Sequence, residues 1–386
     1  MQYRQFGKLD WQVSALGFGC MRLPTIGGDS GNIDQEKTTE MIRRAIDAGL
    51  NYVDTAYVYH DQKSEIALGK ALEDGYRKRV RIATKLPIWM VEKIEDLDTM
   101  LNEELKRLQT DAIDFYLMHA LDQEKWEKVQ GLGLLKKAEA AIADGRIRHV
   151  GFSFHDSLDV FKQIVDGYDG WAFCQIQYNY MDINFQAGRE GLLYAADKGL
   201  AVVVMEPLRG GKLAADVPAA KSIWSSAKNK RKPADWSFQW LWSHPEVSLV
   251  LSGMSTLEQV EENLESADNS RIGLLNAAEL ALVSKVRETL LGLSPIDCTR
   301  CEYCLPCPNG VNIPRVFDYY NRAAMYNDLE ATRCQYKQNV EDCQKAKNCI
   351  QCDECLPKCP QNLPISDWMP VIEEVLGNDQ SYVPNV

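Results

Sequence analysis

"IDFYLMHALDQEKWEKVQGLGLLKKAEAAIADGRIRHVGFS", residues 113–153, contains the unit from which the fold of this chain follows. The first seven and the last five of these residues are short, mainly apolar runs of the kind that form strands. Between them, residues 132–145 have helical periodicity, and Gly145 supplies the left-handed C-cap with which many helices end. A strand, a helix and a second strand in this order predict a βαβ unit with parallel strands.

The same alternation extends over roughly residues 10–270, with further helices expected at residues 35–49 and 95–108. Eight strands, each followed by a helix, within about 260 residues match the size and strand count of a (β/α)8 TIM barrel of the α/β class. The expected strands lie at residues 13–19, 52–56, 80–86, 113–119, 149–153, 172–178, 201–205 and 247–253.

An open, doubly wound sheet is the alternative to the barrel. That fold carries a G-x-G-x-x-G turn after an early strand, where the glycines accommodate a dinucleotide. The corresponding stretch "GFGCMR", residues 17–22, has only the first two glycines. The strand count therefore favours the barrel.

Charge and apolar patterning limit the partners of the chain. It has 43 Lys and Arg against 55 Asp and Glu, and its one short basic run, residues 228–232, is most simply a solvated loop, so nucleic acid is not an expected partner. The N-terminus lacks a secretory signal, and no apolar run approaches the roughly 20 residues that cross a bilayer. We expect a cytoplasmic protein that does not bind a membrane.

The cysteines divide the chain in two. Ten of the twelve lie beyond residue 297, and cysteines in a reducing compartment are better interpreted as metal ligands than as disulfides. We expect a barrel domain at residues 1–290 and a small second domain at residues 291–386.

Four polar residues follow or end the expected strands. Asp54, Lys85 and His119 end strands two, three and four, and Tyr59 follows Asp54 by five residues. Three of them have ordinary alternative roles: Asp54 as a helix cap, Lys85 as a solvent-facing lysine and His119 as a satisfied core histidine. Because barrel active sites lie at the C-terminal ends of the strands, the four together indicate a catalytic site.

These side chains suit proton transfer to a carbonyl. The pKa of an ordinary tyrosine is about 10, and we expect the ammonium group of Lys85 to lower that of Tyr59. Asp54 would keep Lys85 charged and oriented, and His119 would hydrogen-bond the substrate oxygen. A phenol that protonates a carbonyl oxygen while hydride reaches the carbon carries out carbonyl reduction.

The segments that carry these residues resemble the aldo-keto reductase family. The matching segments are "NYVDTAYVY" (51–59), "IATKL" (82–86), "DFYLMH" (114–119), "AIADGRIRHVGFS" (141–153), "IQYN" (176–179) and "GMSTLEQVEENL" (253–264). The resemblance covers residues 1–275 and implies that the four residues above form a catalytic tetrad. It also implies an NADP or NAD cofactor bound by Gly19, Met21, Asp54, Ser153, Gln177, Met205, Pro207, Leu208, Gly210, Gly253, Ser255, Gln259, Glu262 and Asn263.

Some positions depart from the family pattern. Phe154 stands where an asparagine usually contacts the carboxamide, and Met205 where an aromatic ring usually stacks on the nicotinamide. Met254 and Gln259 stand where a lysine and an arginine often bind the adenosine 2′-phosphate, so both NADP and NAD stay open. Arg209 in the preceding loop is a further candidate for a phosphate contact.

Two cysteine runs occupy the expected second domain. "CIQCDECLPKCP" (349–360) has the C-x2-C-x2-C-x3-C-P spacing of bacterial ferredoxins, in which three cysteines ligate one [4Fe–4S] cluster and the fourth ligates the other. "CTRCEYCLPCP" (298–308) is one residue shorter before its last cysteine. Zinc is the alternative, but zinc ribbons separate two C-x2-C pairs by a longer loop. Crossed ligation predicts one cluster on Cys298, Cys301, Cys304 and Cys359, and the other on Cys349, Cys352, Cys355 and Cys307.

The tail is similar to that of ferredoxin-tailed aldo-keto reductases, which implies a small α-helical, ferredoxin-like iron–sulfur domain. The sequence thus predicts an NAD(P)H-dependent oxidoreductase that reduces a small carbonyl substrate, with two [4Fe–4S] clusters as electron relay or structural element. A redox partner protein is a further candidate partner. The alternative is an iron–sulfur electron-transfer protein whose barrel has weakened nicotinamide binding.

Overall fold

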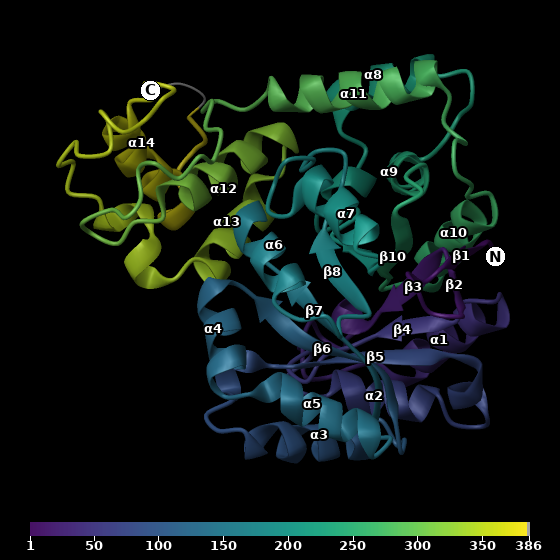
Figure 1. Ribbon diagram of the computed structural model, residues 1–386. Helices are drawn as coiled ribbons and strands as arrows, with labels where there is room; N and C mark the ends of the chain where they lie inside the picture. The colour runs from purple at the N-terminus through teal and green to yellow at the C-terminus, as the bar shows by residue number, and fades with distance from the viewer. Residues whose placement is uncertain (384–386) are drawn as a thin grey trace. The chain divides into compact units, whose positions relative to one another are not determined.

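The computed structural model describes residues 1–383 (Figure 1). The chain divides into two compact units, which we name the barrel unit and the tail unit. The barrel unit comprises Met1–Ala214 and Arg231–Leu280, and the tail unit comprises Ala215–Lys230 and the chain from Ala281 onward. No feature of the sequence indicated that residues 215–230 group with the tail.

Eight parallel strands close into a barrel in chain order, which confirms the expected fold class of the barrel unit. They are β3 (Leu16–Gly19), β4 (Tyr52–Asp54), β5 (Arg81–Leu86), β6 (Ile113–Leu121), β7 (Ile147–Phe154), β8 (Phe173–Gln177), β9 (Ala201–Met205) and β10 (Val247–Gly253). The expected first strand, 13–19, is wrong as a single element. Its start belongs to β2 (Gln12–Ser14), which pairs antiparallel with β1 (Tyr3–Gln5), and only its end forms β3.

Helices surround the barrel (Figure 1). Those of the barrel unit are α1 (Gln35–Asp47), α2 (Ser64–Ala71), α3 (Glu95–Arg107), α4 (Gln123–Gly131), α5 (Leu134–Ala143), α6 (Leu158–Asp166), α7 (Gly188–Asp197), α9 (Pro233–Trp242) and α10 (Leu257–Asp268). In α1, the Asp34 carboxylate caps the helix by accepting the Lys37 N–H, and Met41, Ile42 and Ala45 are buried on one face. Helical spacing of apolar residues thus fixes the face that packs inward.

A layer of aromatic rings fills one end of the barrel. Phe6, from the turn between β1 and β2, is fully buried, and its ring centroid lies 4.8 Å from that of Phe115 and 5.8 Å from that of Phe173. Tyr52 belongs to the same buried cluster. Because these strand residues come from the first halves of β4, β6 and β8, a substrate cavity has to open at the C-terminal ends.

The tail unit is helical. It contains α8 (Pro218–Ser226), α12 (Ile313–Met325), α13 (Leu329–Asn339), α14 (Ile365–Ile372) and a π-helical turn (Glu373–Gly377), while α11 (Ala277–Leu291) crosses the boundary at residue 280. Its core contains Phe317, Tyr320, Tyr336 and Met369. No helix formed by residues 1–383 is long and apolar enough to cross a membrane.

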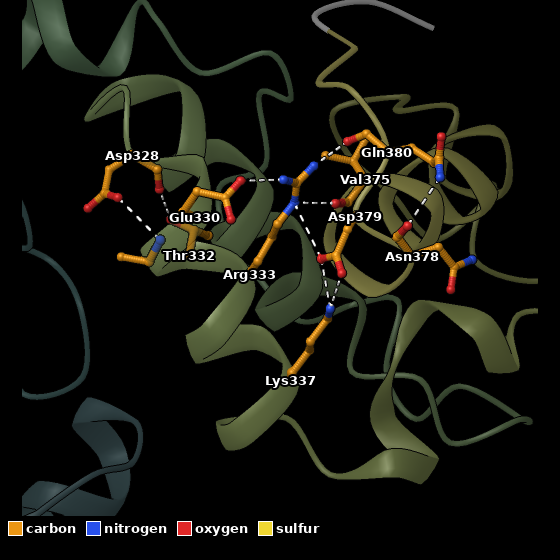
Figure 2. Close-up of polar contacts among 10 residues, drawn as sticks. Asp328, Glu330, Thr332, Arg333, Lys337, Val375, Asn378, Asp379 and Gln380 are labelled. Carbon is orange, nitrogen blue, oxygen red and sulfur yellow. Dashed lines mark hydrogen bonds and ion pairs between the residues drawn. The ribbon is translucent and has the colours of Figure 1, made fainter. Parts of the chain in front are cut away.

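The end of the tail unit is held by Arg333 on α13. Figure 2 shows its guanidinium between α13 and the last described turn, where Nε donates to the Val375 carbonyl at 2.8 Å and Nη2 to the Gln380 carbonyl. The Lys337 ammonium contacts Asp379 at 2.7 Å in the same turn. The bond to Val375 satisfies a carbonyl that the end of the helix leaves unpaired, and the bond to Gln380 fixes the segment that follows it.

Candidate active site

Three of the four predicted catalytic residues form one hydrogen-bonded group. Lys85 on β5 is fully buried, and its Nζ donates to Asp54 Oδ1 at 2.7 Å, to the Thr55 carbonyl at 2.6 Å and to the Tyr59 hydroxyl at 3.4 Å. Neighbouring parallel strands end at one rim of the barrel, so residues 31 positions apart in the chain meet there.

A backbone irregularity turns His119 toward this group. The register of β6 against β7 shifts between Met118 and Leu121, and Ala120 adopts a left-handed φ of 54°. Its N–H donates to the Ser153 hydroxyl at 2.7 Å, which holds the bulge. The His119 ring lies 6.0 Å from the Tyr59 ring, centroid to centroid. Bulges of this kind are used to redirect side chains next to active sites.

The pKa of Tyr59 is raised in the structure, whereas the sequence analysis expected it to be lowered. Burial raises the pKa of the phenol, the charge of Lys85 lowers it and that of Asp54 raises it, and the net direction is upward. The expected lowering was wrong because withdrawal of a phenolate from water outweighs one adjacent cation. Tyr59 therefore keeps its proton in the free protein.

Lys85 and His119 hold opposite protonation states. Burial lowers the pKa of Lys85, but Asp54 and Tyr59 outweigh it and leave the value above its ordinary range, so the side chain stays an ammonium. Burial, with Lys85 adding to it, holds the pKa of His119 well below its ordinary value. Its imidazole is neutral, and Nδ1 has no hydrogen-bond partner among the described residues.

A cavity of about 430 Å³ opens at the C-terminal ends of the strands and is lined by all four predicted catalytic residues. This volume lies in the range of small-molecule sites. Of the predicted cofactor residues, the cavity is lined by Gly19, Met21, Asp54, Ser153, Met205, Pro207, Leu208, Gly210, Gly253, Ser255 and Gln259.

Three predicted cofactor residues are not among the lining residues. The Gln177 amide donates to Asp182 at 3.1 Å, the Asn263 amide donates to the Ser252 hydroxyl at 3.1 Å, and Glu262 pairs with Lys232. Their side chains are thus engaged with other protein groups.

Gln175 lines the cavity where Gln177 was expected. It lies two residues earlier on the same face of β8, is 3% exposed, and its Oε1 has no partner among the described residues. A buried, unpartnered carbonyl oxygen is costly unless a ligand donates to it. The amide NH2 of a nicotinamide carboxamide fits this requirement.

Arg22 is a cavity residue that the sequence interpretation missed. Its stem packs over Gly253, where a Cβ would lie 3.2 Å from Arg22 Cδ, and Nη2 lies 3.6 Å from a Cβ built on Gly210. The side chain is exposed and forms no ion pair with a carboxylate among residues 1–383. The only sequence signal for it was its position three residues after Gly19, the glycine that ends β3.

Arg209, the predicted phosphate contact, is buried instead, with Nε 3.2 Å from Asp182 Oδ2. Phe154 and Met254 are fully buried in the core and do not line the cavity. Gln259 accepts the Ser255 N–H at 2.8 Å. Arg22 is therefore the arginine that lines this cavity among the described residues.

The tail unit places the cysteines that the sequence predicted as cluster ligands around two small cavities. One small cavity is lined by Cys298, Cys301, Cys304 and Cys359, and another by Cys304, Cys307, Cys349, Cys352 and Cys355. All these cysteines are free thiols. Within residues 1–383, no group of three or more His, Cys, Asp or Glu side chains could hold a metal ion.

Comparison with known proteins places the barrel among oxidoreductases. The model of the Aldo/keto reductase family matches residues 15–280. L-galactose dehydrogenase from Arabidopsis thaliana is 27% identical over 318 residues, which cover 76% of this chain and 97% of that protein. The holo form of aldo-keto reductase AKR11C1 from Bacillus halodurans superimposes with a TM-score of 0.60 at 27% identity, covering 74% of this chain and 96% of that one. An aldo-keto reductase from Klebsiella pneumoniae in complex with NADPH shares the fold, with a TM-score of 0.61 at 23% identity and coverage of 74% and 95%.

Proposed function

The chain belongs to the aldo/keto reductase family of oxidoreductases, and we propose that it reduces a small carbonyl substrate with NADPH or NADH. The observation that carries the proposal is the buried Lys85 ammonium, bonded to Asp54 and to the Tyr59 hydroxyl at the floor of the 430 Å³ cavity. The bound nicotinamide would supply hydride to the carbonyl carbon.

Tyr59 acts as the general acid in this proposal. It is protonated in the free protein, so it can donate to the carbonyl oxygen as hydride arrives. The tyrosinate that forms lies against Lys85, whose charge stabilises it at the moment it appears. Asp54 keeps that ammonium charged and fixed. His119 stays neutral and offers its ring to the same oxygen without competing for the proton.

The cofactor residues follow from the lining of the cavity. Gln175 and Ser153 would hold the carboxamide, and Arg22 would pair with phosphate between the loops at Gly210 and Ser255. The unpartnered Gln175 oxygen and the unpaired Arg22 charge favour cofactor binding over the alternative of a barrel that has lost it.

Replacement of Tyr59 by phenylalanine tests the function. Tyr59→Phe removes the proton donor but keeps the ring, so kcat with an activated aldehyde such as 4-nitrobenzaldehyde is expected to fall by about 10²- to 10⁴-fold. NADPH binding, followed by fluorescence, is expected to persist. Tyr57→Phe is the matched control, because that hydroxyl bonds Glu103 at 2.7 Å. Undiminished turnover in Tyr59→Phe would contradict the mechanism.

We also propose that residues 291–386 form a ferredoxin-like domain with two [4Fe–4S] clusters, as in the ferredoxin-tailed branch of the family. Crossed ligation requires two sets of four cysteines. Each predicted set lines one of the two cavities, and Cys304 of the first set also reaches the cavity of the second. The four irons of a [4Fe–4S] cluster are each ligated from the outside by one cysteine thiolate. The ligand cysteines therefore surround a cavity, whereas the ligands of a single metal ion converge on one point. Anaerobic iron and sulfide analysis tests this proposal, with about eight irons per chain expected.

A further inference from the structure

Among the described residues, two cations and two carboxylates line the large cavity of the barrel unit. Lys85 and Asp54 are bonded to each other at 2.7 Å and belong to the catalytic group. The other two are Arg22 and Glu206, the first residue after β9. The proposed reduction does not use Glu206. A carboxylate in a cavity that is to hold a polyanionic cofactor therefore needs a physical reason.

The charged ends of Arg22 and Glu206 approach the same place. Nη2 of Arg22 lies 3.6 Å, and Oε2 of Glu206 lies 3.8 Å, from the position that a Cβ on Gly210 would occupy. The two groups nevertheless form no ion pair, and the Glu206 carboxylate has no hydrogen-bond partner among residues 1–383. A donor and an acceptor that face one space without bonding each other are placed to bind a ligand with both kinds of group.

A nicotinamide dinucleotide has both kinds of group. Its phosphates accept hydrogen bonds from a guanidinium, and its ribose hydroxyls donate to a carboxylate. In doubly wound folds, an acidic residue accepts a hydrogen bond from the ribose 2′-hydroxyl of NAD. A carboxylate only accepts hydrogen bonds, so Glu206 repels an ionised phosphate and attracts a hydroxyl.

NADPH and NADH differ in charge by the phosphate on the adenosine ribose, which adds about 1.5 to 2 negative charges at pH 7. Little in the cavity offsets this addition. Met254 is buried in the core, and Gln259 is an uncharged amide that accepts the Ser255 N–H at 2.8 Å. Lys85 is engaged by the catalytic group, so Arg22 is the cation that remains, and the charge of Glu206 opposes it.

We propose that Glu206 is a specificity-determining residue, which accepts a hydrogen bond from a ribose hydroxyl of the cofactor and makes the protein prefer NADH to NADPH. Arg22 binds a cofactor phosphate at the same space. The inference rests on the proposed nicotinamide-dependent reduction and chooses between the two cofactors that this function allows.

The test measures the dissociation constants of NADH and NADPH by fluorescence at low ionic strength. The wild-type protein is expected to bind NADH at least about threefold more tightly, because the additional phosphate meets an uncompensated carboxylate. Glu206→Gln removes the charge and keeps the size of the side chain. It is expected to tighten NADPH binding about fivefold. NADH binding is expected to change less than about twofold, because the weaker bond to the hydroxyl offsets the smaller repulsion.

Two further measurements separate a local charge from a general one. Glu190→Gln changes the net charge equally but lies on the exposed surface of α7, outside the cavity lining, and is expected to leave both constants unchanged. Glu206→Lys reverses the charge in the cavity and is expected to reverse the preference to NADPH. Added salt is expected to weaken the preference of the wild type, because it screens the repulsion.

NADPH binding by the wild type that equals or exceeds NADH binding would overturn the role of Glu206. An equal change of both dissociation constants in Glu206→Gln would overturn it as well. Either result in a protein that reduces 4-nitrobenzaldehyde counts against this inference alone. A folded wild-type protein that binds neither cofactor would overturn the proposed function too.

Discussion

Lys85 has no contact with solvent, and its charge depends on the two acidic groups that face it. Its pKa in the folded protein lies above the ordinary value of 10.5, so the fold binds its proton more tightly than the unfolded chain does. The stabilisation is fully present below about pH 10.5 and is lost as pH rises through the folded-state pKa.

Asp54→Asn is therefore expected to destabilise the protein and to change its pH profile. Without the carboxylate, burial of Lys85 is no longer offset, and loss of one partner from a buried pair costs about 3 kcal/mol in the free energy of unfolding. The Lys85 pKa falls, so the alkaline limb of kcat/KM moves to lower pH. Urea unfolding and a pH–rate profile measure the two effects.

Asp47→Asn is the matched control for this prediction. Asp47 also pairs with a cation, Arg79, at 2.6 Å, but its side chain is 49% exposed. Surface pairs contribute about 0–1 kcal/mol, and this one lies outside the cavity lining. Equal destabilisation by both substitutions would show that the buried pair has no special role.

Sequence spacing predicted that Asp54, Tyr59, Lys85 and His119 would meet in one cavity, because strand ends of a barrel converge whatever the surroundings. It did not select Gln175 over Gln177, since both lie on the same face of β8 and only the contact with Asp182 separates them. It missed Arg22, and it misjudged the pKa of Tyr59 because burial is a tertiary property.

Helix α3 places a carboxyl group where no water reaches it. Glu104 is fully buried, and its carboxyl group faces the equally buried hydroxyl of Tyr116 and no cation at ion-pair distance among the described residues. Burial holds its pKa well above the ordinary 4.5, and the charge of Glu65 adds to this shift. The folded protein keeps Glu104 protonated at a pH where the unfolded chain has ionised it.

Glu104→Gln is expected to stabilise the protein by an amount that grows with pH. The wild type loses stability as pH rises above about 4.5, because ionisation is available only to the unfolded chain. Glutamine does not titrate, so the difference in unfolding free energy grows by up to about 1.4 kcal/mol per pH unit. Urea unfolding at pH 5 and pH 7 measures it.

Glu103→Gln, at the neighbouring residue, is the control, and its effect on the free energy of unfolding is expected to depend on pH in the opposite direction. Hydrogen bonds from Tyr57 and Arg107 hold the pKa of Glu103 below its ordinary value, so its contribution is present above the unfolded-state pKa and is lost as pH falls. A pH-independent effect of Glu104→Gln would mean that this carboxyl is ionised in the fold.

Elements were predictable where the pattern is local. The helices expected at residues 35–49, 95–108 and 132–145 match α1, α3 and α5 closely. The bounds of the first strand were not predictable in this way. Gln12–Ser14 pairs antiparallel with Tyr3–Gln5, and the periodicity of one segment carries no information about its pairing with another.

Across the whole molecule, the tetrad lies in the barrel unit and the cysteine runs lie in the tail unit. Cysteine content predicted a second domain from residue 291, whereas the barrel unit ends at residue 280 and residues 215–230 group with the tail unit. That grouping depends on spatial contacts of α8 and has no compositional signal.

Cys307→Ser tests crossed ligation in the full chain. Cys307 belongs to the first run in sequence but lines the cavity of the second run. Its loss is expected to lower the iron content from about eight to about four per chain and to spare the cluster on the other set. Cys334→Ser, at an exposed cysteine outside both cavities, is the control and is expected to keep all the iron.

Because the tetrad lies in the barrel unit, reduction of 4-nitrobenzaldehyde is expected to survive both changes. Loss of reduction in Cys307→Ser alone would instead assign the cluster a part in the catalytic cycle, and equal iron loss in both variants would remove the argument for crossed ligation.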